Sequence, residues 1–168
     1  MSITKKFIFI VFITTFCNQA SAEGLKKMGT HKDWETYIIN NETGKVCFAQ
    51  SKPVLQAPKD GMREARLFIT FRPNEKITDE ISITAGYAFN KKNLITAKSG
   101  KNKYKFDMSQ ENFAWMADTK QEKKMIKIMK KGSRIMITGY NQKGSQTIDH
   151  YSLLGFTKAY NATKANCS

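Results

Sequence analysis

The sequence is short of the residues that build redox and metal sites. Its three cysteines include no C-x-x-C pair, the spacing that a dithiol redox site needs. Its two histidines, His31 and His150, are far apart in the sequence, and no dense cluster of carboxylates accompanies either of them. We therefore expect a protein without a metal centre or another cofactor.

Acidic residues are scarce relative to basic ones. The 168 residues include 28 Lys and Arg against 14 Asp and Glu, which gives a formal net charge of +14. Such an excess bears on partners and association rates rather than on the fold. It would attract three classes of partner, namely nucleic acid, anionic lipid headgroups, and acidic glycans or lipopolysaccharide. The alternative is that the lysines only keep the protein soluble.

Long apolar runs are absent except near the N-terminus, where Phe7–Cys17 is broken only by two threonines. A run of about eleven residues is too short to cross the hydrocarbon core of a membrane as a helix. Lys5 and Lys6 precede the run, and Ala20-Ser21-Ala22 supplies an A-x-A cleavage site after it. Residues 1–22 are therefore predicted to be a cleavable signal peptide, with no membrane span left after cleavage. An uncleaved membrane anchor is the alternative.

Cleavage after Ala22 would remove Cys17 and leave Cys47 and Cys167 in a compartment where disulfides persist. Two cysteines allow one intramolecular bridge, which would close a loop of about 120 residues and stabilise the fold by about 4–5 kcal/mol in the chain-entropy model. A free buried thiol and an intermolecular bridge are the alternatives. Export also makes nucleic acid the weakest of the three partner classes.

The rest of the chain has the length of one domain. Residues 23–33 are predicted to form a flexible N-terminal lead, and residues 34–168 a single domain. Short strands are expected where β-branched and aromatic residues cluster or alternate with polar ones. The expected strands are residues 34–39, 45–51, 66–71, 80–85, 94–98, 103–106, 112–116, 134–139 and 147–154.

Helix is expected in two places only. Residues 118–131 carry a capping residue, Asp118, at the start and a stop signal, Gly132, at the end. Residues 156–165 would form a short closing helix that brings Cys167 back to the body. Many short strands joined by turns, with little helix, predict a mainly β fold of the sandwich type.

Several short motifs follow one another in a characteristic order. They are Asp33-Trp34, Lys45–Ala49, Leu67–Pro73, Glu80–Tyr87, Ala114–Ala117, Met129–Ser133, Tyr151–Thr157 and the late Cys167. This ordered set, which covers nearly all of residues 33–167, resembles the invasion-associated locus B (IalB) family of exported bacterial proteins. The resemblance implies an immunoglobulin-like β-sandwich in the cell envelope of a Gram-negative bacterium, whether periplasmic, outer-membrane associated or secreted. The family has no established catalytic residue, so none is transferred to this chain.

The helix over residues 118–131 is the strongest candidate site. Its lysines are Lys123, Lys124, Lys127, Lys130 and Lys131. Met125, Ile128 and Met129 share one face, so the helix combines a narrow apolar face with basic ones, the pattern of a helix that rests on an anionic surface. The alternative is that the apolar face packs on the sandwich and the lysines are solvated. Even then, the docked helix would present its lysines to headgroups or an acidic glycan.

A hydrolytic dyad of Asp149 and His150 is not supported, because adjacent residues on a strand point to opposite faces. The sequence shows no nucleophile and base at a suggestive spacing, and we expect a protein that is not an enzyme. The leading hypothesis is an exported binding or accessory module with a basic surface. Its partner would be anionic lipid headgroups, lipopolysaccharide, an acidic glycan or another envelope protein. A periplasmic chaperone or assembly factor would instead show an exposed sheet edge or apolar groove, and a hydrolase would show a pocket with converging polar groups.

Overall fold

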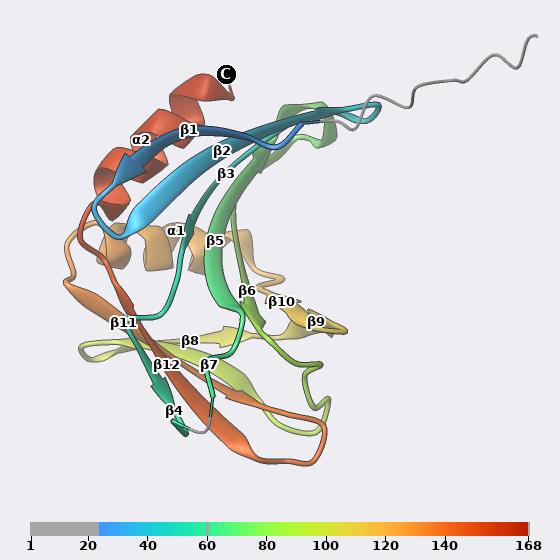
Figure 1. Cartoon of the computed structure of the whole chain (residues 1–168), viewed down its shortest axis with the longest axis vertical. Helices are drawn as coiled ribbons and strands as arrows, with labels where there is room; N and C mark the ends of the chain where they lie inside the picture. Colours follow the sequence, from blue (N-terminus) through green and yellow to red (C-terminus); the bar gives the residue numbers. More distant parts are fainter. Residues whose placement is uncertain (1–23, 60, 168) are drawn as a thin grey trace, which may run out of the picture.

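The fold is described by a computed structural model over residues 24–59 and 61–167. The predicted signal peptide, residues 1–22, lies outside these residues, and so does Cys17. Two antiparallel sheets form a sandwich, with two helices at its side and upper end (Figure 1). This arrangement confirms the mainly β sandwich that the strand pattern predicts, and with it the immunoglobulin-like β-sandwich that the family resemblance implies.

The larger sheet has seven strands and is strongly curved (Figure 1). In spatial order these are β1 (Lys26–His31), β2 (Trp34–Asn41), β3 (Gly44–Ser51), β5 (Ala65–Arg72), β6 (Ile77–Ala85), β10 (Phe113–Trp115) and β9 (Met108–Gln110). A short 3-10 helix, Pro73–Glu75, connects β5 to β6. Alternation along the strands turns Leu67, Ile69 and Phe71 of β5 into the core, as the period of two requires.

The smaller sheet has five strands and closes the lower half of the sandwich. In spatial order these are β4 (Leu55–Ala57), β12 (Gln146–Ser152), β11 (Arg134–Tyr140), β7 (Ile95–Ser99) and β8 (Asn102–Phe106). Its inner side supplies Ile95, Ile135, Ile137 and Tyr151 to the core. The two sheets are also joined by a hydrogen bond, since the buried indole of Trp34 donates to the Ser152 carbonyl at 3.0 Å.

The two helices complete the core from outside the sheets. α1 (Thr119–Met129) contacts β6, and α2 (Phe156–Asn166) covers the inner side of β1, β2, β3 and β5. The ring of Phe156 lies edge-on to Trp34, with 4.9 Å between centroids. No helix among the described residues is long and apolar enough to cross a membrane.

A disulfide fastens α2 to the centre of the larger sheet. Cys47 on β3 is bonded to Cys167, which directly follows α2, and both residues are buried. Their Cα atoms are 5.7 Å apart, within the usual range for a disulfide. The predicted intramolecular bridge is therefore confirmed.

Three short strands were not expected from the sequence. The flexible lead predicted for residues 23–33 is wrong for Lys26–His31, which pair with β2 through a tight turn at Lys32 and Asp33. β4 and β9 are the other two, and both lie between the strands expected from the sequence. These segments are held by backbone pairing to a neighbour, and their own residues carry little strand preference.

Candidate functional site

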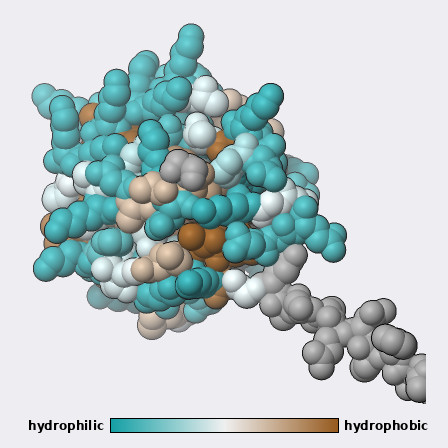
Figure 2. All heavy atoms as spheres, turned by 90° about the horizontal axis from the view of Figure 1, so that it is seen from above, coloured by the Kyte–Doolittle hydropathy of each residue, from teal (hydrophilic) through white to brown (hydrophobic). Residues whose placement is uncertain are grey.

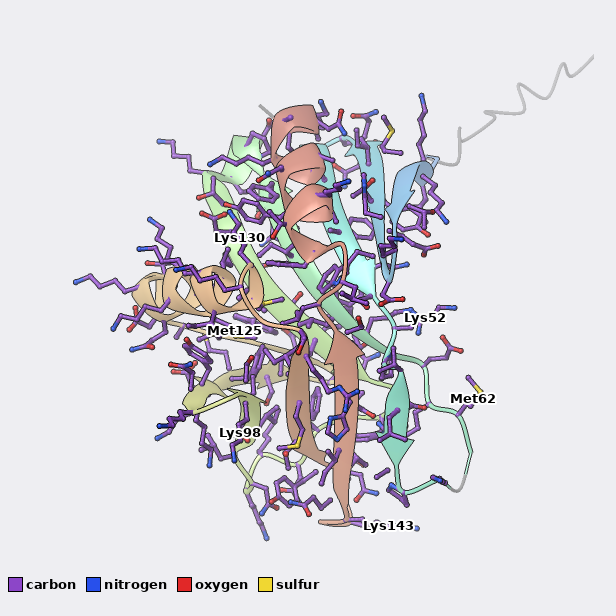
Figure 3. The ribbon with its side chains drawn as sticks, turned by 90° about the vertical axis from the view of Figure 1, so that its left-hand side faces the viewer. Lys52, Met62, Lys98, Met125, Lys130 and Lys143 are labelled. Atoms are coloured by element: carbon purple, nitrogen blue, oxygen red, sulfur yellow. A yellow bond between two sulfur atoms is a disulfide. The ribbon has the colours of Figure 1, made fainter. Side chains whose placement is uncertain are left out.

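The lysines of α1 lie on its exposed side. Asp118 caps the helix by accepting a hydrogen bond from the Lys120 amide at 2.8 Å, and Met125, Ile126 and Met129 are buried beneath it. Figure 3 shows Met125 under the helix and long side chains extending from the helix away from the body. The helix is thus docked on the sandwich by its apolar face and still presents its lysines outward.

Lys130 differs from the other predicted lysines, because α2 engages it. Its ammonium lies 3.7 Å above the centre of the Tyr160 ring, and burial lowers its pKa, against the opposing attraction of Asp79. The Tyr160 hydroxyl in turn donates to Asp79 at 2.6 Å. Lys130 therefore takes part in the contact between α1, α2 and β6. Lys123 also differs from the other lysines of the helix, because it lines a hollow together with the acidic residues Glu80 and Glu122.

The outer side of the five-stranded sheet carries basic side chains that the helix prediction did not include. Lys98 on β7 lies opposite Lys103 on β8, and Thr96 lies opposite Lys105. Arg134, at the start of β11, is exposed as well. Within these five strands the sole acidic residue is Asp149, which points inward and is 2% exposed. Lysines alternating with apolar residues in the expected strands 94–98 and 103–106 were the sequence signal for this face.

The helix and this sheet meet along β8. Lys103 and Lys105 line a hollow of about 290 Å³ together with Gln121 of α1, and Gln121 lies one turn before Lys124 on the same side of the helix. We name the combined area the basic surface. It consists of Lys98, Lys103, Lys105, Lys124, Lys127, Lys131 and Arg134, all exposed. In the described part of the chain none of these seven forms an ion pair with an acidic side chain.

The charge of the chain is concentrated in the part that forms this surface. Residues 86–168 contain 16 basic and 5 acidic residues, whereas residues 23–85 contain 10 and 9. Figure 2 shows hydrophilic side chains projecting over most of the face seen from above, with small hydrophobic patches between them. Figure 3 shows Lys98 on the sheet below α1, on the side from which the helix projects. The excess of basic over acidic residues therefore comes mainly from residues 86–168, which include all seven residues of the basic surface.

Asp149 and His150 do not face each other. The Asp149 carboxylate points into the sandwich and binds Arg63, while His150 lies opposite Met136 and Leu55 on the outer side of the sheet. Among the described residues, no three His, Cys, Asp or Glu side chains converge as metal ligands would. The alternation of the strand thus separates the two residues, as the sequence indicates.

Glu122 is a buried acid in the first turn of α1. Its side chain accepts a hydrogen bond from the Ile81 amide at 2.9 Å and is 4% exposed. Burial raises its pKa to about 7; the Ile81 hydrogen bond opposes this shift, and nearby acidic groups add to it. Those neighbours are Glu80, Asp79 and Asp118. Glu122 therefore holds α1 against β6 as a largely uncharged group in mildly acidic solution.

Comparison with known proteins finds a matching family and a solved structure of similar fold. The sequence model of the Invasion associated locus B (IalB) protein family matches residues 34–164. Among solved structures, the crystal structure of invasion associated protein B from Bartonella henselae is similar, with a TM-score of 0.56 at 11% sequence identity. The match covers 82% of this chain and 95% of that one. No curated protein sequence matches.

Proposed function

This chain belongs to the invasion-associated locus B family, and from that premise we propose that it is an exported, non-enzymatic protein of the cell envelope that binds anionic lipid headgroups through its basic surface. Binding is electrostatic and needs no chemical step. The phosphate groups of phospholipids or of lipopolysaccharide would be the charges recognised.

The observation that carries this proposal is the basic surface itself. Seven exposed basic side chains lie on one side of the fold, and none of them is neutralised by an acidic partner in the described residues. A basic residue near an anionic membrane contributes about 1 kcal/mol to binding. Added salt would weaken the attraction, because these charges are exposed to solvent.

Export is supported by two independent features. The predicted signal peptide over residues 1–22 would direct the chain out of the cytoplasm. The disulfide between Cys47 and Cys167 suits a compartment in which thiols are oxidised. An exported protein meets lipid headgroups and lipopolysaccharide before it meets nucleic acid.

The test is co-sedimentation of residues 23–168 with vesicles that contain phosphatidylglycerol, with pure phosphatidylcholine vesicles for comparison. One variant changes Lys98, Lys103, Lys105, Lys124, Lys127 and Lys131 to Gln. The matched control removes the same charge elsewhere, by changing Lys26, Lys52, Lys59, Lys76, Lys158 and Lys164 to Gln; all twelve side chains are exposed. We expect the first variant to bind at least about 100-fold more weakly, and the control to stay within about fivefold of the parent.

Equal loss in the two variants would mean that net charge alone, without a defined surface, causes binding. Retention on heparin without binding to anionic vesicles or lipopolysaccharide would show that the ligand is an acidic glycan and that the proposed lipid binding is wrong. If no anionic ligand is bound at low salt, the proposed function is wrong.

A further inference from the structure

The outer side of the seven-stranded sheet contains a hollow that none of the residues of the basic surface lines. Its volume is about 350 Å³, within the range of small-ligand sites. Four aromatic side chains form its walls, namely Phe48, Phe68, Phe113 and Trp115. Thr70 and Ser82 also line it, and Arg72 and Glu80 lie at its border. The hollow is therefore apolar at its walls and polar at a few defined points.

Strand register brings these residues together from four separate segments. Phe48 on β3 lies opposite Thr70 on β5, and Phe68 lies opposite Ser82 on β6. Ser82 in turn lies opposite Trp115 on β10. The ring centroids of Phe48 and Phe68 are 6.0 Å apart, so the rings support each other in edge-on contact. The site is thus built on paired strands, which hold it rigidly.

Two hydroxyl groups in the hollow lack a protein partner. Thr70 is 7% exposed and Ser82 is 9% exposed, yet neither side-chain oxygen forms a hydrogen bond to any described residue. Neither oxygen belongs to the fully buried side-chain atoms that lack a partner, so each opens into the hollow and can hydrogen-bond to water or to a ligand there. Both residues line the hollow, so a molecule in the hollow would meet two free hydroxyl groups.

The charged groups at the border carry no net positive charge, because one guanidinium is paired with two carboxylates. Arg72 donates to both oxygens of Glu80, at 3.0 and 2.9 Å, and to Glu75 at 3.1 Å. The border thus offers donors and acceptors in fixed positions without a net positive charge. An anionic headgroup would meet two carboxylates here, whereas an uncharged ligand with several hydroxyl groups would find partners for them. The hollow therefore differs from the basic surface in the sign of its charge.

We propose that the hollow binds one sugar ring of an uncharged saccharide. The C–H face of such a ring is apolar and packs on aromatic walls, while its hydroxyl groups both donate and accept hydrogen bonds. Thr70, Ser82 and the Arg72–Glu80 pair supply the matching groups. The proposal goes beyond the proposed function and is independent of it, because it concerns the other sheet and a ligand without charge.

Trp115 provides a direct measurement of binding. It lines the hollow, whereas Trp34, the second tryptophan of the chain, is fully buried in the core. Maltose, cellobiose and N,N′-diacetylchitobiose are titrated at millimolar concentration into a solution of residues 23–168, and tryptophan fluorescence is recorded. We expect a saturable change with at least one of them, and no change in a Trp115→Phe variant.

The variant Thr70→Val/Ser82→Ala tests the hydroxyl groups without changing the fold. Since these hydroxyls have no protein partner, their loss should leave the unfolding transition unchanged or raise it, while saccharide binding weakens about 10- to 100-fold. The matched control, Thr96→Val/Thr138→Val, removes two hydroxyls from the outer side of the other sheet and should bind like the parent.

Three results would overturn the proposal. The first is no saturable response to any of the saccharides. The second is unchanged binding in the Thr70→Val/Ser82→Ala variant. The third is a response of Trp115 to decanoate or to a phenylalanine-containing peptide but to no sugar, which would make the hollow an apolar docking site.

Discussion

Arg63 and Asp149 form a two-bond ion pair inside the fold, at 3.0 and 2.5 Å, although 86 residues separate them in the chain. Arg63 also donates to the Ala85 carbonyl at 3.0 Å and lies over the ring of Tyr87. Asp149 is almost fully buried on β12. The pair therefore ties the segment between β4 and β5 to both sheets of the sandwich.

Removing one partner of this pair should destabilise the protein strongly. Asp149→Ala leaves the guanidinium of Arg63 without its counter-charge, and we expect a loss of about 3–5 kcal/mol in the free energy of unfolding. The double change Arg63→Met/Asp149→Leu should be less harmful than Asp149→Ala alone, because no unpaired charge remains. Denaturant unfolding of the variants measures this. A double variant less stable than the single one would contradict the expected coupling.

Reduction of the disulfide should destabilise the domain and loosen α2. The bond joins residues 120 positions apart, and its removal in Cys47→Ala/Cys167→Ala should cost about 4–5 kcal/mol on the chain-entropy model. Hydrogen exchange should rise mainly in α2, which would then be held by the packing of Phe156 and Tyr160 and by the contacts of Tyr160 with Asp79 and Lys130. Denaturant unfolding with and without a reductant checks the magnitude. An unchanged midpoint would show that the bridge adds nothing to the fold.

Glu122 should make the protein less stable as pH rises through the range from about 4.5 to about 7. Its pKa is about 7 in the folded protein against 4.5 in a free side chain, so the folded state binds more protons in that range. The neutral carboxyl makes its full contribution to the free energy of unfolding below about pH 4.5. This contribution, at most about 3 kcal/mol, is lost as the pH rises to about 7. Glu122→Gln should be the more stable protein at pH 8.

Denaturant unfolding at several pH values tests this assignment. Glu122→Gln can still accept the hydrogen bond from the Ile81 amide, so the comparison isolates the charge. Glu42→Gln, at an exposed position, is the matched control and should keep the pH dependence of the parent. Identical pH dependence in parent and Glu122→Gln would exclude Glu122 as its source.

Gly155 should not tolerate a side chain. Its φ is +89°, and a Cβ there would collide with the backbone carbonyl of His31. We expect Gly155→Ala to lower the free energy of unfolding by about 3 kcal/mol or more, from strain and clash together. Gly100→Ala is the control, because Gly100 also has a positive φ but open space around it. It should cost about 1–2 kcal/mol, and equal effects of the two changes would rule out the clash.

The sequence predicted the elements whose own residues carry a pattern. Alternation along β5 and β11 and the cap at Asp118 are local signals, and the structure confirms all three. β1 has no such signal, because its sequence KKMGTH owes its conformation to pairing with β2. Local preference was therefore sufficient for the centre of the sheets and for the edge strand β8, and insufficient for the other three edge strands, β1, β4 and β9.

The same distinction between local patterns and long-range contacts applies to the candidate sites. The lysine periodicity of α1 could be recognised in one short segment, but the contact of Lys130 with Tyr160 depends on how α1 and α2 pack. The hollow on the larger sheet depends on the register of four strands, since Thr70 and Ser82 meet only when β5 and β6 pair. Glu122 likewise becomes buried only because α1 packs on β6. Such long-range relationships leave no mark in the spacing of residues along the chain.

The position of the two disulfide cysteines also sets an order of events during synthesis. Cys47 lies in a central strand of the larger sheet, and its partner is made 120 residues later. The strands of the smaller sheet and both helices are translated between them. The bond can therefore form only when almost the whole domain is available to fold, and its presence marks a chain that has been translated at least as far as Cys167.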